Sequence, residues 1–349
     1  MLEEYKIRIC PESELSSLIS FINNHWAKDH ILSISEELLR WQHYSREDRS
    51  YNFVIAQPQY SSEIYGILGF IMPRHFDPRI KFCDLWLTTW KVTGNTGIPN
   101  LGLALLFFLL REKNPRSISS FGINFDAIPI YKSLGYKIGT VNHYYIVNQN
   151  MRSFDLIGNF DGEFYSNASS AKKTKKFLKY SGSDLKTFNS TSNNGLFSHQ
   201  VPSKSISYLY ERYINHPIYH YDIYAIYKNE DLQCFFVIRE SCFKSAKALR
   251  IVDLVGRANG LDGTIDLFQN MLLDYDAEYI DFYNLGLSNK LLSSAGFIKR
   301  SKSSNVIIPN YFEQFEKRNV ELIYAFKSDS KLPYSIFKGD CDQDRPNKL

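Results

Sequence analysis

The sequence contains little that could build a metal centre or a disulfide framework. Its cysteines are five in number and scattered, and none forms a CxxC pair or another metal-ligand spacing. They stand at Cys10, Cys83, Cys234, Cys242 and Cys341. We therefore expect no metal site and no disulfide scaffold, and a reducing compartment is the natural environment.

Long apolar runs are also missing. The longest, residues 101–110, is far shorter than the about 20 residues that a membrane-spanning helix needs. The first residues, 1–5, show neither a basic n-region nor an apolar h-region. The sequence therefore favours a soluble cytoplasmic protein without a membrane partner.

No strong charge of one sign is present. The net charge of +4 is small and spread along the chain, which argues against nucleic acid as the main partner and suits an anionic small substrate. A length of 349 residues predicts about two domains. The hydrophobic share of 44% and charged share of 22% are ordinary for a globular protein.

The chain does contain an internal repeat. Three positions recur at the same spacing in the second half, because Gly102, Tyr131 and Gly135 correspond to Gly263, Leu292 and Gly296. The residues around these positions match in kind. Only the first copy keeps a titratable hydroxyl, at Tyr131, where the second has Leu292. The repeat therefore predicts an enzyme in which the first unit carries the catalytic group and the second unit has another role.

The hydrophobic pattern predicts mixed strands and helices in both halves. In the first half we expect a strand at 5–10, helices at 12–23 and 33–42, a hairpin at 51–57 and 64–72, a strand at 85–92 followed by a loop and a helix, then a strand, a helix and a closing strand at 141–147. In the second half we expect helices at 205–214, 263–273 and 288–295, strands at 222–228, 232–239, 249–255 and 279–283, and closing strands up to residue 326.

Composition divides the chain into two domains and a connector. Residues 166–204 are rich in Ser, Asn, Thr, Lys and Gly and read as a linker. The predicted domains are therefore 1–165 and 205–349, the second ending in an Asp-rich tail that stands outside the repeat.

One stretch of the first half resembles a known family. Residues 124–136 read Asn-Phe-Asp-Ala-Ile-Pro-Ile-Tyr-Lys-Ser-Leu-Gly-Tyr. This resembles the segment of the GNAT acyltransferases in which an Asn begins a helix, a Tyr follows and Leu-Gly-aromatic ends it, and the element order over about residues 4–148 is similar as well. The resemblance implies an α/β (α+β) fold of two tandem GNAT-like mixed sheets flanked by helices. It also implies acyl-CoA (coenzyme A) as co-substrate, without a metal.

The resemblance places the pyrophosphate of CoA on the loop at 93–102. This sequence departs from the family there, because the usual Arg/Gln and first glycine fall on Gly97 and Asn100, and only the last glycine survives, as Gly102. Backbone N–H groups at a helix N-terminus still suit a phosphate. The implied cofactor-binding residues are Lys91, Val92, Asn95, Thr96, Gly97, Asn100, Leu101, Gly102, Leu103, Asn124, Ile128 and Tyr131.

Direct acyl transfer to an amine needs three things. The amine must be neutral, the thioester oxygen must be polarised, and the departing thiolate must be protonated or stabilised. Tyr131 stands where the family has its general acid, although a helix tyrosine packed against the pantetheine is the alternative. The oxyanion contact is expected from a backbone N–H near Lys91 and Val92.

No residue is decisive as general base. The candidates in the first half are His25, His30, Asp84 and His143, and the histidines of the second half are further ones, but a lone histidine is more often a hydrogen-bond partner than a catalyst. A sugar amine of modest basicity is partly neutral near pH 7, so that a strong base is not required.

Polar residues of the second half, with His30, predict an acceptor-binding wall. Asp253 interrupts an apolar strand, and a buried charge there needs either a ligand or a structural partner such as Arg250 or Arg345. The predicted substrate-binding residues are His30, His216, Tyr219, Tyr221, Asp253, Asp281, Asp342, Asp344 and Arg345.

A narrower resemblance concerns the acceptor. The tandem layout, His30-Ile-Leu with Trp41-Gln, the turn at 215–217 and the tail at 344–347 are similar to bacterial N-acyltransferases of nucleotide-linked amino sugars. A dTDP- or UDP-linked amino sugar for surface polysaccharide, such as the O antigen of lipopolysaccharide, is the implied partner. Two alternatives remain: a Fem-like transferase that uses aminoacyl-tRNA, and a non-catalytic GNAT-like binding module.

Overall fold

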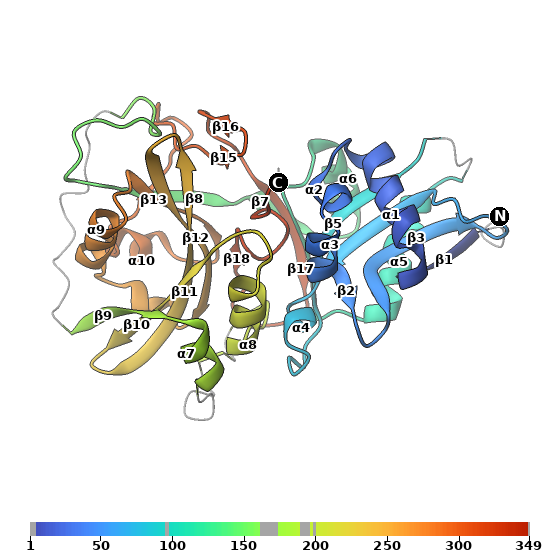
Figure 1. The fold of residues 1–349 in the computed structure, drawn as a ribbon, viewed down its shortest axis with the longest axis horizontal. Helices are drawn as coiled ribbons and strands as arrows, with labels where there is room; N and C mark the ends of the chain where they lie inside the picture. Colours follow the sequence, from blue (N-terminus) through green and yellow to red (C-terminus); the bar gives the residue numbers. More distant parts are fainter. Residues whose placement is uncertain (1–4, 95–97, 161–173, 189–195, 198–199, 348–349) are drawn as a thin grey trace.

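The computed structural model describes residues 5–94, 98–160, 174–188, 196–197 and 200–347. It consists of two eight-stranded mixed sheets, each flanked by helices, which lie next to each other (Figure 1). The predicted fold class is thereby confirmed. Within the described residues, no helix combines the length and the apolarity needed to cross a bilayer.

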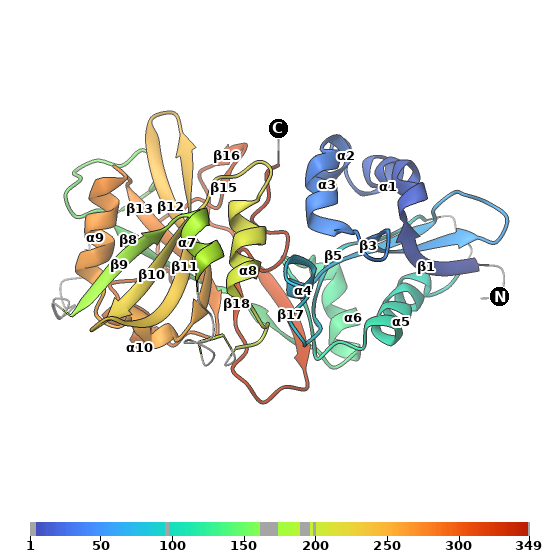
Figure 2. The same ribbon diagram turned by 60° about the horizontal axis from the view of Figure 1, so that its bottom comes forward.

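The first sheet is mixed, with antiparallel strands around one parallel pair among its described strands. Its order is β1 (Tyr5–Pro11), β3 (Ser50–Pro58), β4 (Gly66–Ile71), β5 (Asp84–Val92), β6 (Ser117–Phe121), β17 (Ile323–Ser328) and β7 (Lys137–Thr140), with β2 (Tyr44–Ser45) beside β3. Among the described residues only β5 and β6 pair in parallel. The first-unit helices and short turns are η2 (Glu12–Glu14), α1 (Leu15–Phe21), η3 (Ile22–Trp26), α2 (Ile31–Ile34), α3 (Glu36–His43), α4 (Pro73–Phe76), α5 (Leu101–Lys113), η4 (Phe125–Ala127) and α6 (Ile128–Ser133). Figure 2 shows α1, α2 and α3 on one face of this sheet and α5 and α6 on the other.

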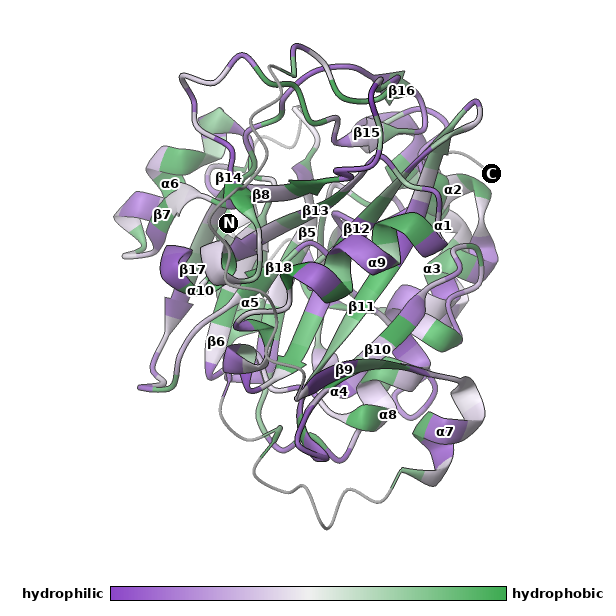
Figure 3. Cartoon of the chain, turned by 90° about the vertical axis from the view of Figure 1, so that its left-hand side faces the viewer, coloured by the Kyte–Doolittle hydropathy of each residue, from purple (hydrophilic) through white to green (hydrophobic). Residues whose placement is uncertain are grey.

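The second sheet repeats this pattern. Its order is β9 (Lys175–Tyr180), β10 (Asp222–Lys228), β11 (Asp231–Phe243), β12 (Ala246–Gly256), β13 (Tyr279–Leu285), β8 (Asn142–Val147) and β14 (Ile298–Lys299), with β18 (Ile336–Phe337) beside β13, and β12 and β13 are its parallel pair. The remaining elements are α7 (Gly182–Thr187), α8 (Ile206–Leu209), η6 (Tyr210–Ile214), η7 (Ala258–Leu261), α9 (Ile265–Asp274), α10 (Asn289–Ser294) and the hairpin β15 (Tyr311–Phe312) with β16 (Phe315–Glu316). Figure 3 shows the apolar strands of this sheet behind α9, which has one hydrophobic and one hydrophilic face.

The anchors of the repeat are structural in both copies. Tyr131 is 2% exposed and Leu292 is fully buried, each on the short helix that follows the second strand of its parallel pair. Gly135 and Gly296 end these helices with φ of 77° and 91°, a left-handed conformation that favours glycine. The spacing of the repeat therefore reflects a shared helix-end geometry.

One strand is exchanged between the two halves, which corrects the sequence-based expectation. The strand predicted at 141–147 to close the first copy is β8, and it pairs with β13 and β14 in the second sheet. Its counterpart in the first sheet is β17, which comes from the end of the chain and pairs with β6 and β7. Alternating apolar residues predict a strand but carry no information about its partner. The sheets therefore do not follow the division at residues 165 and 205.

The predicted linker and tail are also parts of the fold. Residues 166–204 contain the edge strand β9 and the helix α7, which starts with a capping box at Ser181. The tail, expected outside the repeat, is largely buried between the two units, with Asp340 and Cys341 almost inaccessible. Figures 1 and 2 both place the C-terminus between the two halves. Lysine-rich and Asp-rich segments resemble solvated linkers in composition, and only their tertiary partners reveal otherwise.

Because two histidines are buried, we expect the free energy of unfolding to depend on pH in the acidic range. Burial lowers the pKa of His43 to about 3 and that of His143 to about 4. Both values lie below the about 6.5 of an unfolded chain, so the unfolded state binds more protons between these limits. The free energy of unfolding should therefore fall as the pH drops from about 6.5 to about 4, by up to about 1.4 kcal/mol per pH unit and histidine.

Urea unfolding across this pH range measures the effect. His43→Gln should flatten the pH dependence, whereas His25→Gln, at an exposed position, should leave it unchanged. An identical pH dependence in His43→Gln and wild type would contradict the assignment.

Candidate functional site

The parallel strands β5 and β6 separate at their C-terminal ends. They pair only from Asp84 to Leu87 on β5, and β5 then continues to Val92 beside β4 alone. The register of β4 and β5 shifts at this point, because Gly69 lies opposite a bulge at residues 88 and 89. A Cβ on Gly69 would lie 2.5 Å from the Thr88 hydroxyl, so the bulge requires glycine. Beyond Leu87 β5 no longer pairs with β6, so within the described residues the backbone groups of 88–92 on that side have no partner in β6.

The N-terminus of α5 follows this opening. Asn100 precedes the helix with a left-handed φ of 61°, and the first N–H groups of the helix, at Leu101, Gly102 and Leu103, have no intrahelical partner. A Cβ on Gly102 would lie 3.2 Å from Nε1 of Trp90 on β5. The predicted phosphate-binding residues Asn95, Thr96 and Gly97 lie outside the described residues. The described part of the loop thus forms a helix N-terminus, a local geometry that attracts anions.

Tyr131 lies on α6, buried beside the same opening. Its ring packs against Trp90 at 6.0 Å and Tyr136 at 5.1 Å between ring centroids. Burial raises the pKa of Tyr131 to about 12, although a hydrogen bond with Ser120 opposes this shift. The phenol therefore keeps its proton near neutral pH, as a proton donor must.

The other predicted cofactor residues surround this position. Lys91 and Val92 form the end of β5, where Lys91 pairs with Ile67. Asn124 precedes the turn η4 without a side-chain cap, and Ile128 begins α6. The chain thus brings the end of β5, the start of α5 and the start of α6 to one edge of the sheet.

The second unit has a comparable opening, but its own chain fills it. Strands β12 and β13 pair only from Ala248 to Ile251 on β12. Beyond that point β18 pairs with Asn284 and Leu285 of β13, and the Gly339 N–H donates to the Val252 carbonyl at 2.7 Å. A substrate chain cannot enter between these strands while the tail occupies them.

The tail then continues to the first opening. The Cys341 thiol lies 3.6 Å from the carbonyl of Leu87, where β5 and β6 separate. The Gln343 amide donates to the Phe121 carbonyl at the end of β6, at 3.1 Å. The tail therefore links the two openings.

A pocket of about 310 Å³ lies beside this part of the tail, at the junction of the units. Residues of the first unit, of strands β11 and β12, of the β15 hairpin and of the tail line it together. They are Gly122, Ile123, Tyr219, Arg239, Arg250, Asn310, Tyr311, Phe312, Glu313, Val320, Glu321, Leu322, Ile323, Lys338, Asp342, Gln343, Arg345 and Asn347.

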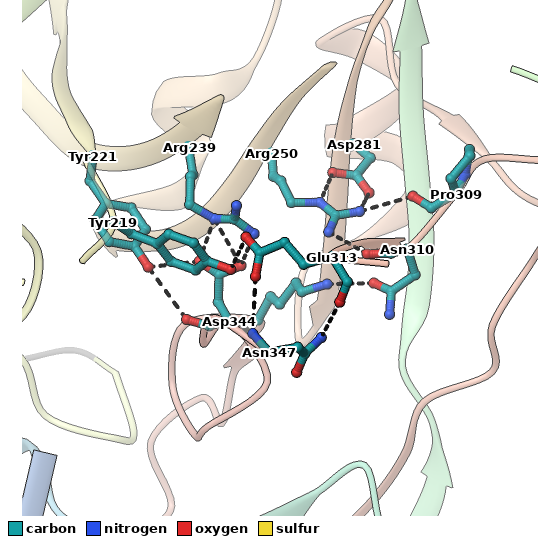
Figure 4. Close-up of polar contacts among 11 residues, drawn as sticks. Tyr219, Tyr221, Arg239, Arg250, Asp281, Pro309, Asn310, Glu313, Asp344 and Asn347 are labelled. Carbon is teal, nitrogen blue, oxygen red and sulfur yellow. Dashed lines mark hydrogen bonds and ion pairs between the residues drawn. The ribbon is translucent and has the colours of Figure 1, made fainter. Parts of the chain in front are cut away.

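Two arginines form the charged wall of this pocket. Arg239 on β11 and Arg250 on β12 are direct neighbours in the strand register. Each is held by its own carboxylate: Arg239 contacts Asp344 at 2.8 Å, and Arg250 contacts Asp281 at 2.9 Å (Figure 4). Burial alone would raise the pKa of Asp344, but the charge of Arg239 holds it well below its usual range. These pairs stay ionised at neutral pH and keep both guanidinium groups in place.

The structure brings some of the predicted acceptor residues to the pocket. Tyr219, Asp342 and Arg345 line it. The Tyr219 ring lies 4.0 Å from the Arg239 guanidinium, and its hydroxyl donates to Glu313 at 2.7 Å. Arg345 contacts Asp342 at 2.9 Å.

Five other predicted residues do not line the pocket but hold its side chains in place, directly or through one another: His30, His216, Tyr221, Asp281 and Asp344, of which Asp344 binds Arg239. Tyr221 donates its hydroxyl to Asp344 at 2.9 Å, and Asp281 holds Arg250. His30 contacts Arg345 at 3.1 Å. His216 accepts the Tyr219 N–H at 2.9 Å and so shapes the turn before β10.

The expectation that Asp253 contributes to the acceptor wall is not supported by the pocket. Asp253 is fully buried, does not line the pocket, and contacts Lys204 at 2.5 Å and the Tyr213 hydroxyl at 2.7 Å. The partner of Asp253 is therefore Lys204, which belongs to the predicted linker, and not Arg250 or Arg345. A buried strand carboxylate needs a counter-charge, and here a segment distant in sequence supplies it.

The candidate general bases of the first half are largely engaged elsewhere. Asp84 pairs with Arg116, and His143 contacts Asp281 at 3.2 Å while it stacks on Tyr283. His25 is exposed in the last turn of η3. None of these three lines the pocket.

Sequence reasoning missed several lining residues. Arg239 and Arg250 carried a usable signal, because each is a charge inside an apolar strand, the same feature that drew attention to Asp253. Asn310, Glu313 and Lys338 carried none, because they lie in irregular segments whose place depends on the tertiary fold.

No protein-family model matches the sequence, and no curated protein matches it. Solved structures do. A GCN5-related N-acetyltransferase from Anabaena variabilis has 9% identity over 92% of this chain and 72% of its own, with a TM-score of 0.54. One from Kribbella flavida has 11% identity over 92% of this chain and 70% of its own, with a TM-score of 0.52. At such low identity the likeness concerns the fold, and this chain has the fold of the GCN5-related N-acetyltransferases.

Proposed function

We propose that the chain is an acyl-CoA-dependent N-acyltransferase. Acyl-CoA binds the first unit, with its diphosphate at the N-terminus of α5 and its thioester in the opening between β5 and β6. The acceptor amine binds in the pocket between the units. The observation that carries the proposal is the position of this opening between Tyr131 and the pocket.

A short series of contacts connects the two. Ser120 hydrogen-bonds with Tyr131, and its hydroxyl lies 3.4 Å from the Leu87 carbonyl. The same carbonyl lies 3.6 Å from the Cys341 thiol, next to the pocket residue Asp342. A thioester in the opening beyond Leu87, beside residues 88–92, would have the proton donor Tyr131 on one side and an acceptor amine in the pocket on the other.

The proposed reaction follows from this arrangement. The neutral amine attacks the thioester carbon, and the unpaired backbone N–H groups of 88–92 stabilise the negative charge on the carbonyl oxygen. The C–S bond then breaks, and Tyr131 donates its proton to the departing thiolate. The amine loses one proton as the amide forms, and Asp342, which follows Cys341 in the tail and lines the pocket, accepts it. Tyr131 regains its proton from solvent after CoA leaves.

We propose a nucleotide-linked (dTDP or UDP) amino sugar as the acceptor, used in cytoplasmic steps of surface polysaccharide biosynthesis. The polar pocket supports this choice, because it combines arginines with the Tyr219 ring, a surface suited to a charged ligand with a hydroxyl-rich ring. The predicted residues Asp342 and Arg345 would contact the acceptor directly, while His30, Tyr221, Asp281 and Asp344 would hold the contacting side chains.

Release of free CoA thiol from acetyl-CoA, measured with a panel of dTDP- and UDP-linked amino sugars, tests this function. Transfer to the amino sugars but not to their hydroxyl counterparts supports it. Calorimetric CoA binding without transfer to any amine indicates a binding module instead. Transfer only from aminoacyl-tRNA indicates the Fem-like alternative.

Gly102→Leu should abolish CoA binding. A Cβ at this position already lies 3.2 Å from the Trp90 indole, so a leucine would displace Trp90 and cover the N–H groups of the helix N-terminus. Calorimetry with CoA measures the effect.

The matched control is Gly263→Asn in the second unit, where φ of 63° is tolerated by asparagine. It should bind CoA like the wild type. The opposite result, normal binding in Gly102→Leu and loss in Gly263→Asn, would show that the roles of the two units are reversed.

A further inference from the structure

Lys338 is a buried lysine whose side chain no carboxylate of the described residues pairs with. It lines the pocket and is only 3% exposed. Within the described residues its ammonium group hydrogen-bonds to Asn310 and forms no ion pair within 4.0 Å. The Tyr283 ring lies 5.4 Å away. A buried ammonium in this situation is costly unless an anion reaches it.

The arginines around Lys338 are, in contrast, already paired. Arg250 binds Asp281 and the carbonyls of Pro309 and Asn310, and Arg239 binds Asp344. Burial and then the charge of Arg250 lower the pKa of Lys338 well below its usual range, with Arg239 acting in the same direction and Asp344 and Asp281 against it. Without a ligand, Lys338 therefore loses its proton more easily than an exposed lysine.

Two further groups of residues that line the pocket lack a partner among the described residues: Nε of Arg345 lacks a hydrogen-bond acceptor, and the Glu313 carboxylate lacks a cation. Nε of Arg345 is buried and makes no hydrogen bond to the described residues. Glu313 accepts hydrogen bonds from Tyr219 and from the Asn347 N–H at 2.9 Å, but it forms no ion pair with a described residue. The pocket thus offers one amine and one carboxylate that form no ion pair with a described residue, so each can pair with a charged group of a ligand.

We propose that Lys338 binds an oxyanion of the acceptor, so that the acceptor carries an anionic group in addition to its amine. This inference rests on the proposed acyl transfer, and it assigns to Lys338 the recognition of the anionic part of the acceptor, such as the diphosphate of a nucleotide-linked amino sugar. Glu313, which lines the same pocket, faces the positively charged or hydrogen-bonding part of the same molecule.

Calorimetry with simple anions tests the inference without acyl-CoA. Sodium phosphate, pyrophosphate and acetate are titrated into the full chain at about pH 8, in two buffers of different ionisation enthalpy. We expect at least one anion to bind with uptake of up to about one proton, because the bound oxyanion restores the charge of Lys338. Lys338→Met should weaken binding about 10-fold or more and remove the proton uptake.

The control is Lys331→Met, an exposed lysine of the segment that precedes β18, which should bind like the wild type. Binding of phosphate or pyrophosphate alone assigns a phosphoryl group, and binding of acetate alone assigns a carboxylate. A wild type that binds none of the three, or a folded Lys338→Met that binds them equally with the same proton uptake, overturns the inference. If Lys338→Met does not fold, the wild-type titration is the test: anion binding with proton uptake supports the inference, and binding without proton uptake overturns it.

Failure here is distinguishable from failure of the proposed function. Acyl transfer to an uncharged amine without anion binding rejects only the oxyanion site. Anion binding at Lys338 without acyl transfer to any amine rejects only the transferase.

Discussion

Replacing Tyr131 with phenylalanine should lower the turnover of acyl transfer by about 100-fold, because the thiolate then leaves without a proton donor. The substitution keeps the ring that packs against Trp90 and Tyr136, so the fold and the affinity for CoA should persist. We expect the lower end of the usual range for acid catalysis, since a thiolate with a pKa of about 8.5 is already a fair leaving group.

The measurement is steady-state turnover at saturating acyl-CoA, together with the Michaelis constants of both substrates. Tyr136→Phe is the matched control, because Tyr136 belongs to the same buried ring cluster and its hydroxyl has no hydrogen-bond partner among the described residues. It should retain normal turnover. Unchanged turnover in Tyr131→Phe would show that Tyr131 only packs against the pantetheine, and would leave the backbone N–H groups and substrate alignment as the sources of rate.

Lys204→Met should lower the free energy of unfolding by about 3–5 kcal/mol. Lys204 is 2% exposed and contacts both Asp253 and Asp340, so it joins strand β12 to the tail. Without the ammonium group, two buried carboxylates remain close to each other, and the substitution leaves at least one charge without a partner. Burial already raises the pKa of Asp340 to about 6 with Lys204 in place.

Urea unfolding at about pH 7.5 measures this effect, and a double variant controls it. Lys204→Met combined with Asp253→Asn removes a charge of each sign, so it should be more stable than Lys204→Met alone. If Lys204→Met were as stable as the wild type, the contacts of Lys204 would not hold the tail in place.

Because Lys204 and strand β12 bind the tail, deleting the tail cannot test acceptor binding alone. Residues 339–347 include the buried Asp340, Cys341 and Asp344, and Gly339 and β18 fill the opening of the second sheet. Deletion would therefore damage the fold as well as the pocket. Point substitutions at Asp342 or Arg345, which line the pocket, are the appropriate tests of acceptor binding.

Much of the secondary structure could be predicted from the sequence, because it depends on local features. The period of apolar residues located β5 and α5, and the glycines with left-handed φ, Gly135 and Gly296, marked the ends of equivalent helices. The contrast of Tyr131 with Leu292 is likewise a local fact, and it directs the proposed chemistry to the first unit. These features need no knowledge of distant partners.

Only the tertiary structure decided which distant segments meet. The exchange of β8 and β17, the tail between the two openings, the pairing of Lys204 with Asp253 and the place of Lys338 in the pocket all join residues far apart in sequence. An apolar period predicts that a face is buried but not against what, and a buried charge predicts a partner but not which one. The repeat and the candidate proton donor were therefore determined by the sequence alone, whereas the pocket exists only because the folded chain brings its end back between the two sheets.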